Sequence, residues 1–320
     1  MLLDLWDNDG LIRNFMELYG VSAGQICRIL RELYFDKEQD NVAIFCSQTG
    51  VMLDEVDAAR DLELCGKLVS TTTDDFECLR EMGLVSLDRL LENDTPISRH
   101  LKKYQIEIRP DRHELVYMGQ SFYIPYDEDC KWCSYGDEQC RYAGERYKDL
   151  YCAYLKAISP LAVKLYKDCC EIEMFLTAPR AEMLGYSTVR RFPEIFCTVE
   201  GFINDQFGER LSIGSDWERL KQHTYIATIR LRYDDLTYKN RYTCGRDGAD
   251  ATDMFLRYEG FCRGEYDCAE EVPVRFWDNV WLIDICLDLI RRSGEASSEV
   301  CAGVKRGVAF PFDEMHIELV

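Results

Sequence analysis

The sequence predicts an α+β fold with a mixed, mainly antiparallel sheet flanked by helices and a helical region at the N-terminus. Three observations lead to this prediction. Residues 10–20 and 23–34 carry apolar side chains at helical spacing. Residues 224–236 alternate apolar and polar side chains, as a strand with one buried face does. Residues 106–125 contain short strands separated by turns at 109–112 and 118–120, which is typical of antiparallel pairing.

The length of the chain is sufficient for two domains. Its 320 residues are 47% hydrophobic and 12% aromatic, which is enough to build a packed core. We expect a helical N-terminal region at 1–65 and an α+β main domain at 66–320. The sequence leaves open whether the first region packs on the second.

The N-terminal residues and the apolar runs bear on the location of the protein. No apolar run reaches the roughly 18 to 20 residues of a membrane-spanning helix. The first ten residues, MLLDLWDNDG, contain acids where a signal peptide carries basic residues. The sequence therefore predicts a cytoplasmic protein that does not enter a membrane.

The charge of the chain limits its partners. With 58 acidic and 38 basic residues, the formal net charge is −20. A field of that sign repels nucleic acid and anionic lipid. It predicts an acidic, solvated surface, disfavours direct binding of nucleic acid, and favours a basic protein as partner.

The chain contains 16 cysteines, scattered over its whole length. Several lie within apolar runs, so we interpret most of them as reduced core thiols. Cys130, Cys133 and Cys140 have the spacing that best fits a metal site, because a C-x-x-C turn can supply two thiolates to zinc. Cys152 is the nearest candidate for a fourth ligand, with His113 as another. The alternative is a chance spacing among many cysteines.

Local patterns predict the elements of the first hundred residues. The segment 41–46 (NVAIFC) predicts a strand, 47–50 a turn, and 51–68 a helix. A strand at Leu68, Val69 and the following hydroxyl residues is expected to lead into a capped helix that ends at Gly83.

The rest of the chain predicts further helices, strands and loops. Thr95 and Pro96 have the residue types of a helix cap and first turn. Ser215 is expected to cap a short helix. The remaining expectations are a helix at 143–166, a strand at 169–178, a helix through Phe196, Val199, Phe202 and Ile203, a loop at 237–251, a strand at 268–276, a helix at 276–292, a loop at 293–303 and a strand at 308–320.

Common catalytic motifs are absent from the sequence. It has no H-E-x-x-H, G-x-S-x-G, Walker or G-x-G-x-x-G motif. The four histidines, His100, His113, His223 and His316, have no neighbour at metal-ligand spacing. The sequence therefore does not indicate a histidine-based mechanism.

One order of elements points to a ligand site. Hydroxyl residues Ser70, Thr71 and Thr72 follow the strand at 68–69, and hydroxyls beside a helix N-terminus can hold an anionic ligand. The helix after them carries Phe76 and Leu79 and ends at Gly83-Leu84. Much later come the strand at 224–236 and a segment opened by Glu270 and Glu271.

This order resembles the ADP-ribosyltransferase-like superfamily over roughly residues 66–90 and 222–276. The resemblance implies that NAD binds near Ser70, Thr71 and Thr72. It implies that Glu271, or Glu270, serves the transfer, since a fixed carboxylate stabilises an oxocarbenium-like state. Arg230 or Arg232 would meet the diphosphate. The sequence departs from the family at the first strand, where Ser70 or a neighbour replaces the expected His or Arg.

Two functions from different classes are therefore expected. The first is an NAD-dependent enzyme that transfers ADP-ribose to protein or nucleic acid. The alternative is a non-enzymatic, acidic interaction protein, such as an inhibitor or accessory subunit in bacterial or phage defence or anti-defence. The acidic balance and the missing histidine motifs favour the alternative.

Overall fold

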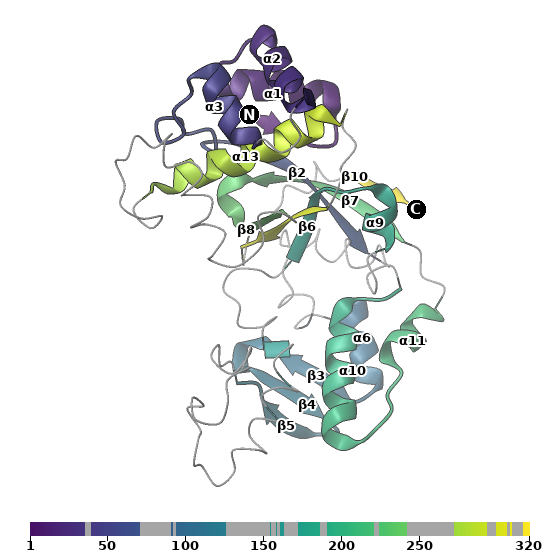
Figure 1. The fold of residues 1–320 in the computed structure, drawn as a ribbon. Helices are drawn as coiled ribbons and strands as arrows, with labels where there is room; N and C mark the ends of the chain where they lie inside the picture. The colour runs from purple at the N-terminus through teal and green to yellow at the C-terminus, as the bar shows by residue number, and fades with distance from the viewer. Residues whose placement is uncertain are drawn as a thin grey trace. The chain divides into compact units, whose positions relative to one another are not determined.

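The computed structural model of the chain describes residues 1–35, 40–70, 91, 94–125, 154, 158, 161–162, 172–185, 191–220, 224–241, 272–292, 299–305, 308 and 316–320. The fold is α+β with mainly antiparallel strand pairing and a helical N-terminal region, which confirms the predicted class (Figure 1). The chain forms two compact units. Unit 1 contains Met1–Leu68, Glu173–Leu184 and Thr228–Val304, and unit 2 contains Val69–Ile172, Gly185–Ala227 and Lys305–Val320.

Unit 1 begins with a short strand and the two predicted helices. Strand β1 is Leu2–Leu3, helix α1 is Asn8–Tyr19 and helix α2 is Ala23–Phe35. Helix α1 ends at Gly20, whose φ of 62° suits a residue without a Cβ. Ser22 Oγ accepts a hydrogen bond from the Gln25 N–H at 3.3 Å, as expected for a residue at a helix start.

The predicted strand at 41–46 is wrong, because these residues form helix α3, Asn41–Thr49. Asp40 caps it by accepting hydrogen bonds from the backbone N–H groups of Val42 and Ala43. Gly50 ends it with a φ of 73°. The apolar run looked like a strand, but the two caps stabilise a helix.

The predicted helix at 51–68 is also wrong. Residues 51–61 form turns, and strand β2 is Glu63–Ser70. Asp61 has a φ of 53°, which a helix does not accommodate. The Glu63 N–H donates to Met1 O at 2.8 Å, and β1 pairs with β2 in parallel. A partner from the chain terminus thus makes this segment a strand, and the predicted boundary after residue 65 falls inside it.

The main sheet has seven strands, in the order β10-β7-β2-β6-β9-β8 with β1 beside β2. Pairing is antiparallel between β2 and β6 and between β8 and β9. The additional strands are β6 (Ile172–Thr177), β7 (Tyr225–Arg232), β8 (Leu236–Arg241), β9 (Val300–Val304) and β10 (His316–Leu319).

Strands β6 and β7 confirm predictions, and β10 confirms the strand predicted at 308–320 for residues 316–319 only, whereas β8 and β9 lie where loops were expected. The expected loop at 237–251 is wrong for residues 237–241, and the expected loop at 293–303 is wrong for residues 300–303. All five residues of β9 are buried, although its sequence, VCAGV, contains small side chains. Its sequence does not alternate apolar and polar side chains, so the strand is recognised only from its pairing with β8.

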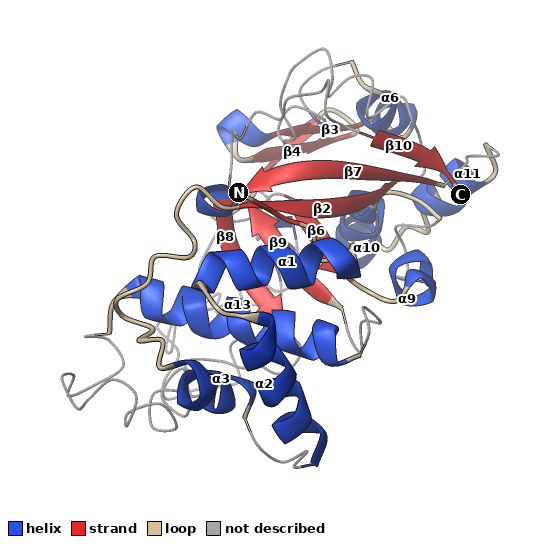
Figure 2. Cartoon of the chain, turned by 90° about the horizontal axis from the view of Figure 1, so that it is seen from above, coloured by secondary structure: helices blue, strands red, loops and turns tan. Residues whose placement is uncertain are grey.

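Helix α13, Val274–Arg291, packs against α1 and α3. The predicted strand at 268–276 is therefore wrong for Val274–Phe276, since Pro273 stands at the helix N-cap. Figures 1 and 2 show α1 and α13 over one face of the strands of unit 1. The predicted helix at 276–292 is confirmed, and its buried residues lie on nearly all sides, because it has helices on one side and the sheet on the other.

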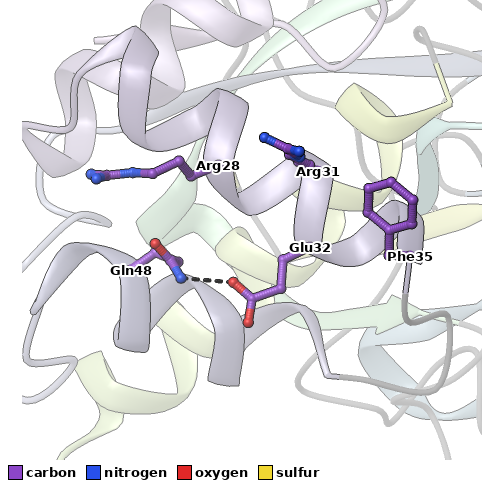
Figure 3. Close-up of a pocket in the computed structure, with 5 residues that line it drawn as sticks. All are labelled: Arg28, Arg31, Glu32, Phe35 and Gln48. Atoms are coloured by element: carbon purple, nitrogen blue, oxygen red, sulfur yellow. Dashed lines mark hydrogen bonds between the residues drawn. The ribbon is translucent and has the colours of Figure 1, made fainter.

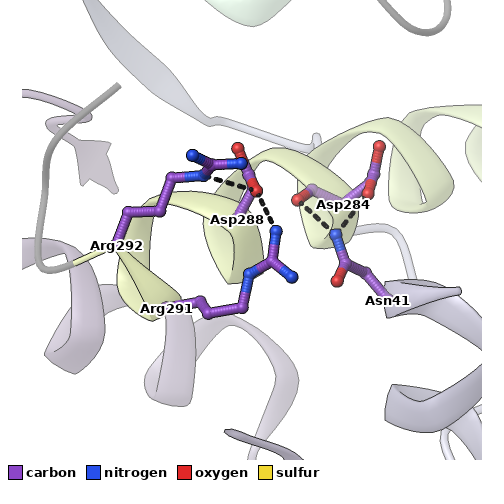
Figure 4. Close-up of polar contacts among 5 residues, drawn as sticks. All are labelled: Asn41, Asp284, Asp288, Arg291 and Arg292. Carbon is purple, nitrogen blue, oxygen red and sulfur yellow. Dashed lines mark hydrogen bonds and ion pairs between the residues drawn. The ribbon is translucent and has the colours of Figure 1, made fainter. Parts of the chain in front are cut away.

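Polar side chains attach α13 to α3 and also form contacts within the end of α13 itself (Figure 4). Asn41 Nδ2 donates to Asp284 Oδ1 at 2.6 Å. Asp288 is 7% exposed, and its Oδ1 accepts from Arg291 at 2.7 Å and from Arg292 at 3.1 Å. Arg291 lies in the last turn and Arg292 at the C-cap, where positive charge also offsets the helix dipole.

Unit 2 contains a separate three-stranded antiparallel sheet, β3-β4-β5. Phe122 of this sheet packs against Phe202 and Phe207, with ring centroids 6.5 and 5.2 Å apart. The buried Ile106 and Ile108 alternate with the exposed or half-buried Glu107 and Arg109, as predicted. The elements are α6 (Pro96–Lys103), β3 (Ile106–Arg109), β4 (Glu114–Tyr117), β5 (Gln120–Tyr123), α10 (Glu194–Phe207) and α11 (Ile213–Glu218); helix α9 (Arg180–Gly185) follows β6.

The cap predicted for α6 is confirmed, and the cap predicted for α11 is not. Thr95 Oγ1 accepts from the Ser98 N–H and Ser98 Oγ accepts from the Thr95 N–H, which is a reciprocal capping box. In α11, Ser212 holds the N-cap position and Ser215 lies inside the helix. The helix predicted to end at Gly83 and most of the helix predicted at 143–166 lie outside the described residues.

Candidate functional site

Most residues of the predicted sites lie outside the described part of the chain. These are Thr71, Thr72, Glu270, Glu271, Cys130, Cys133, Cys140 and Cys152. Ser70 is the last residue of β2, while Arg230 and Arg232 are exposed residues of β7.

The structure places β2 and β7 side by side, as neighbours in one sheet. The Tyr233 N–H, just after β7, donates to Leu62 O, just before β2, at 2.8 Å. Arg232 therefore lies near the start of β2, whereas Ser70 is at its other end. Arg232 forms an exposed ion pair with Asp234 at 3.7 Å. The two strands thus do not bring Ser70 and Arg232 together.

Cys65 of β2 is held as a neutral thiol. Burial and the neighbouring Asp4 raise the pKa of Cys65 to about 12, while the charges of Arg230 and Lys67 act in the opposite direction. Trp6 Nε1 donates to the Cys65 carbonyl at 3.3 Å, and Lys67 Nζ lies 4.0 Å from the Trp6 ring centroid. A thiol with such a pKa is not a nucleophile at neutral pH.

The other shifted groups of unit 1 also belong to packing. Burial raises the pKa of Tyr19 and of Tyr233 above the usual range, and Asp278 contributes to both shifts. Tyr233 donates to Asp278 Oδ1 at 2.6 Å, and Tyr19 donates to Asn279 Oδ1 at 3.1 Å. Within the described ranges, no group of three or more His, Cys, Asp or Glu side chains is arranged to hold a metal ion.

The best candidate for a binding surface is a groove between α2 and α3 in unit 1 (Figure 3). Its volume is about 390 Å³. Four lining residues come from α2 and one from α3: Arg28, Arg31, Glu32, Phe35 and Gln48. The opposite face of α2 buries Ile26, Ile29 and Leu33 in the core. The amphipathic pattern of α2 therefore turns the groove residues away from the core.

The carboxylate of the groove has a hydrogen-bond partner, whereas its two arginines have none among the described residues. Gln48 Nε2 donates to Glu32 Oε2 at 2.7 Å, so this carboxylate is bonded to α3. Arg28 and Arg31 are exposed and form no ion pair or hydrogen bond with the described residues. Within the described residues, two arginines three positions apart on α2 thus lack a charge partner, on a protein with a net charge of −20.

Two aromatic side chains lie at the end of α2. Tyr34 is 72% exposed and Phe35 is 76% exposed, with their ring centroids 5.5 Å apart and their planes nearly perpendicular. Surfaces that combine aromatic residues with arginine are typical of the energetic centres of protein interfaces. The sequence analysis did not predict this surface. A signal was present, because Tyr34 and Phe35 directly follow Leu33 but lie outside the buried stripe of α2.

A second groove, of about 410 Å³, lies on the small sheet of unit 2 and includes Lys102, Glu107 and Arg109. Arg109 is bonded to Glu107 at 2.9 Å and paired with Glu114 at 3.5 Å. The hydrogen bond from Arg109 lowers the pKa of Glu107. Because these charges neutralise each other, this groove is less suited to a charged ligand than the α2–α3 groove.

No family model, curated protein or solved structure matches the chain. In the part of the chain that the structure describes, no helix is long and apolar enough to cross a membrane.

Proposed function

We propose that this chain is a non-enzymatic interaction protein that acts by binding another protein, as an inhibitor or accessory subunit does. The exposed arginine–aromatic surface of α2 carries this proposal, since Arg31, Tyr34 and Phe35 are open to solvent. Side chains of these types dominate the binding energy of many interfaces. The net charge of −20 supports a partner that is basic overall, because opposite charges speed association.

The proposed location is the cytoplasm. Six described cysteines form no disulfide bond. Cys46, Cys65, Cys286 and Cys301 are buried, whereas Cys27 and Cys197 are exposed. Reduced thiols of this kind suit a reducing compartment.

Site-specific photo-crosslinking tests the proposed function. A photoreactive amino acid replaces Phe35 in the cells that make the protein, and replaces Tyr123, which is 61% exposed in unit 2, in the control. We expect a discrete adduct with one protein from position 35 and not from position 123. The adduct yield should fall as salt rises, because electrostatic association is screened. No adduct at position 35, or the same adducts at both positions, would contradict the function.

A second candidate is NAD-dependent ADP-ribosyl transfer, which rests on the order of elements in the sequence; β2 and β7 are neighbours in one sheet, but Ser70 and Arg232 lie at opposite ends of β2. NAD at about a hundred times its dissociation constant would stabilise the fold by roughly 2.7 kcal/mol, which thermal unfolding detects. Glu271→Gln is then expected to abolish turnover while the unfolding temperature without NAD stays the same. Unchanged turnover in this variant rules out the transfer role of Glu271.

A structural zinc at Cys130, Cys133, Cys140 and Cys152 is a further proposal. It is supported by the C-x-x-C spacing, since thiolates at this spacing suit tetrahedral zinc. One zinc per chain in the purified protein, lost in Cys130→Ser/Cys133→Ser, is the expected result by elemental analysis. Zinc retained in that variant would contradict the site.

A further inference from the structure

We propose that the α2–α3 groove binds a short acidic peptide segment that carries a large apolar side chain, an inference that rests on the proposed interaction function. The segment belongs to the protein partner. Its carboxylates would meet Arg28 and Arg31, and its apolar side chain would pack on Tyr34 and Phe35. The groove thus favours an acidic ligand, although the chain as a whole is acidic.

The geometry of α2 presents the groove residues together. Arg28, Arg31 and Phe35 are three and four residues apart, so their side chains follow one another along a single helix face. Gln48 completes the groove from α3 and is bonded to Glu32, which ties the two helices at this point. The lining therefore belongs to two helices that pack on each other.

The charge state of the arginines points to an anionic ligand. A guanidinium binds a carboxylate through two parallel hydrogen bonds, and it stays charged at every physiological pH. Among the described residues that line the groove, Glu32 is the only carboxylate, and its Oε2 already accepts from Gln48. The field of the other acidic residues repels acidic segments elsewhere, which confines their binding to this groove.

The aromatic pair distinguishes a peptide from an inorganic anion. Tyr34 and Phe35 expose most of their surface and touch each other edge to face, so they offer an apolar platform next to the arginines. Arginine and aromatic side chains also bind single-stranded nucleic acid. A polyanion, however, would bring many phosphates into the field of a protein with net charge −20, whereas a peptide segment brings only a few carboxylates.

The test is a selection from a displayed library of random 12-residue peptides against the full chain. We expect the selected peptides to be rich in Asp and Glu and to contain at least one Leu, Phe, Trp or Met. Their affinity should fall about tenfold in Arg28→Glu/Arg31→Glu, since removing a charged partner costs about 1.4 kcal/mol or more at such a site. Phe35→Ser should lower the affinity of these peptides about fivefold, because their apolar side chain loses its contact with the ring.

The matched control is Arg13→Glu/Arg210→Glu, which makes the same change of charge at two exposed arginines outside the groove. Its affinity for the selected peptides should fall less than about twofold. A similar loss in both double variants would show a general charge effect and overturn the inference.

Three other outcomes also overturn the inference. These are no enriched peptides, enriched peptides without acidic bias, and an oligo-dT or oligo-U strand that binds with the same dependence on Arg28 and Arg31. The proposed function is judged separately by the adduct at position 35. An adduct together with peptides that lack acidic bias removes this inference alone, whereas no adduct removes the function.

Discussion

At the scale of single residues, Asn279 connects three separate parts of unit 1. Its side chain is fully buried. Its Nδ2 donates to the carbonyls of Leu53 and Val56 at 2.7 Å each, and its Oδ1 accepts from Tyr19. The side chain thus supplies hydrogen-bond donors to the carbonyls of Leu53 and Val56, which lie in the turns at 51–61.

Asn279→Leu is expected to lower the free energy of unfolding by about 3 kcal/mol, because the buried Leu53 carbonyl and the part-buried Val56 carbonyl lose their donor. Tyr19→Phe removes only one hydrogen bond and should cost about 1 kcal/mol. Urea unfolding of both variants measures the difference. A smaller loss in Asn279→Leu than in Tyr19→Phe would contradict the anchoring role.

His100 is the second residue with a consequence for stability. It is buried among the rings of Tyr104, Phe196 and Trp217, and its Nε2 lies 2.9 Å from Ile213 O. Because a carbonyl only accepts, Nε2 carries the proton. The buried Nδ1 finds no hydrogen-bond partner in the described structure. Burial lowers the pKa of His100, and the nearby Lys103 adds to this, while the Ile213 carbonyl and Asp216 oppose it.

The pH dependence follows from the sign of this shift. Below a pH of about 6.5 the unfolded chain binds a proton at His100 before the folded chain does, so the free energy of unfolding falls as the pH drops toward the lowered pKa. His100→Phe should flatten this slope in denaturant unfolding measured from about pH 5 to 7. His316→Gln, which removes an exposed histidine of β10, is the comparison variant for the loss of one histidine. An unaltered slope in His100→Phe would exclude this histidine as the source.

At the scale of elements, helix caps explain why some segments are helical. Helix α3 has a β-branched and aromatic composition that favours a strand, yet Asp40 and Gly50 bound it as a helix. Helix α6 has a capping box and Pro96 in its first turn, and its prediction from sequence was correct. The cap of α3 could have been recognised by the same logic, but Asp40 belongs to the charged segment DKEQD, which resembles a loop.

Asp40→Ala is expected to cost about 1 kcal/mol, since two N–H groups of the first turn lose their acceptor. Asp57→Ala, at an exposed acid of the following turns, is the control and should change stability by less than about 0.5 kcal/mol. Thermal unfolding compares the two variants. Equal effects would mean that Asp40 acts through its charge and not as a cap.

At the scale of the whole molecule, the chain builds each unit from three separate segments. Unit 1 takes its helices from the N-terminus and its central helix α13 from residues 274–291. A single boundary along the sequence does not describe such an arrangement. The net charge of −20 also acts at this scale, because like charges repel within the folded chain.

Salt is therefore expected to stabilise the protein. Raising NaCl from about 0.05 to 0.5 M shortens the Debye length from roughly 14 to 4 Å and weakens the repulsion among the acids. The midpoint of thermal unfolding should rise by a few degrees, and KCl should give the same rise. A lower midpoint at high salt would show that attractive ion pairs outweigh the repulsion.

The local sequence was sufficient for the segments whose patterns contain their own boundaries. The helices α1, α2, α6 and α10 and the strand β7 were predicted, because helical spacing, caps and alternation act within a few residues. The α+β class followed from these segments. The candidate site was not predicted, since the exposure of Tyr34 and Phe35 depends on how α2 packs against α3.

Packing between distant segments decided the rest. Strand β2 forms beside the chain terminus, β9 forms against β8, and α13 is enclosed by helices and sheet, so its buried residues surround it. A strand obtains its hydrogen bonds from another segment, whereas a helix satisfies its own. For this physical reason helices α1, α2, α6 and α10 could be read from the sequence, while β2, β9 and the α2–α3 groove required the folded molecule.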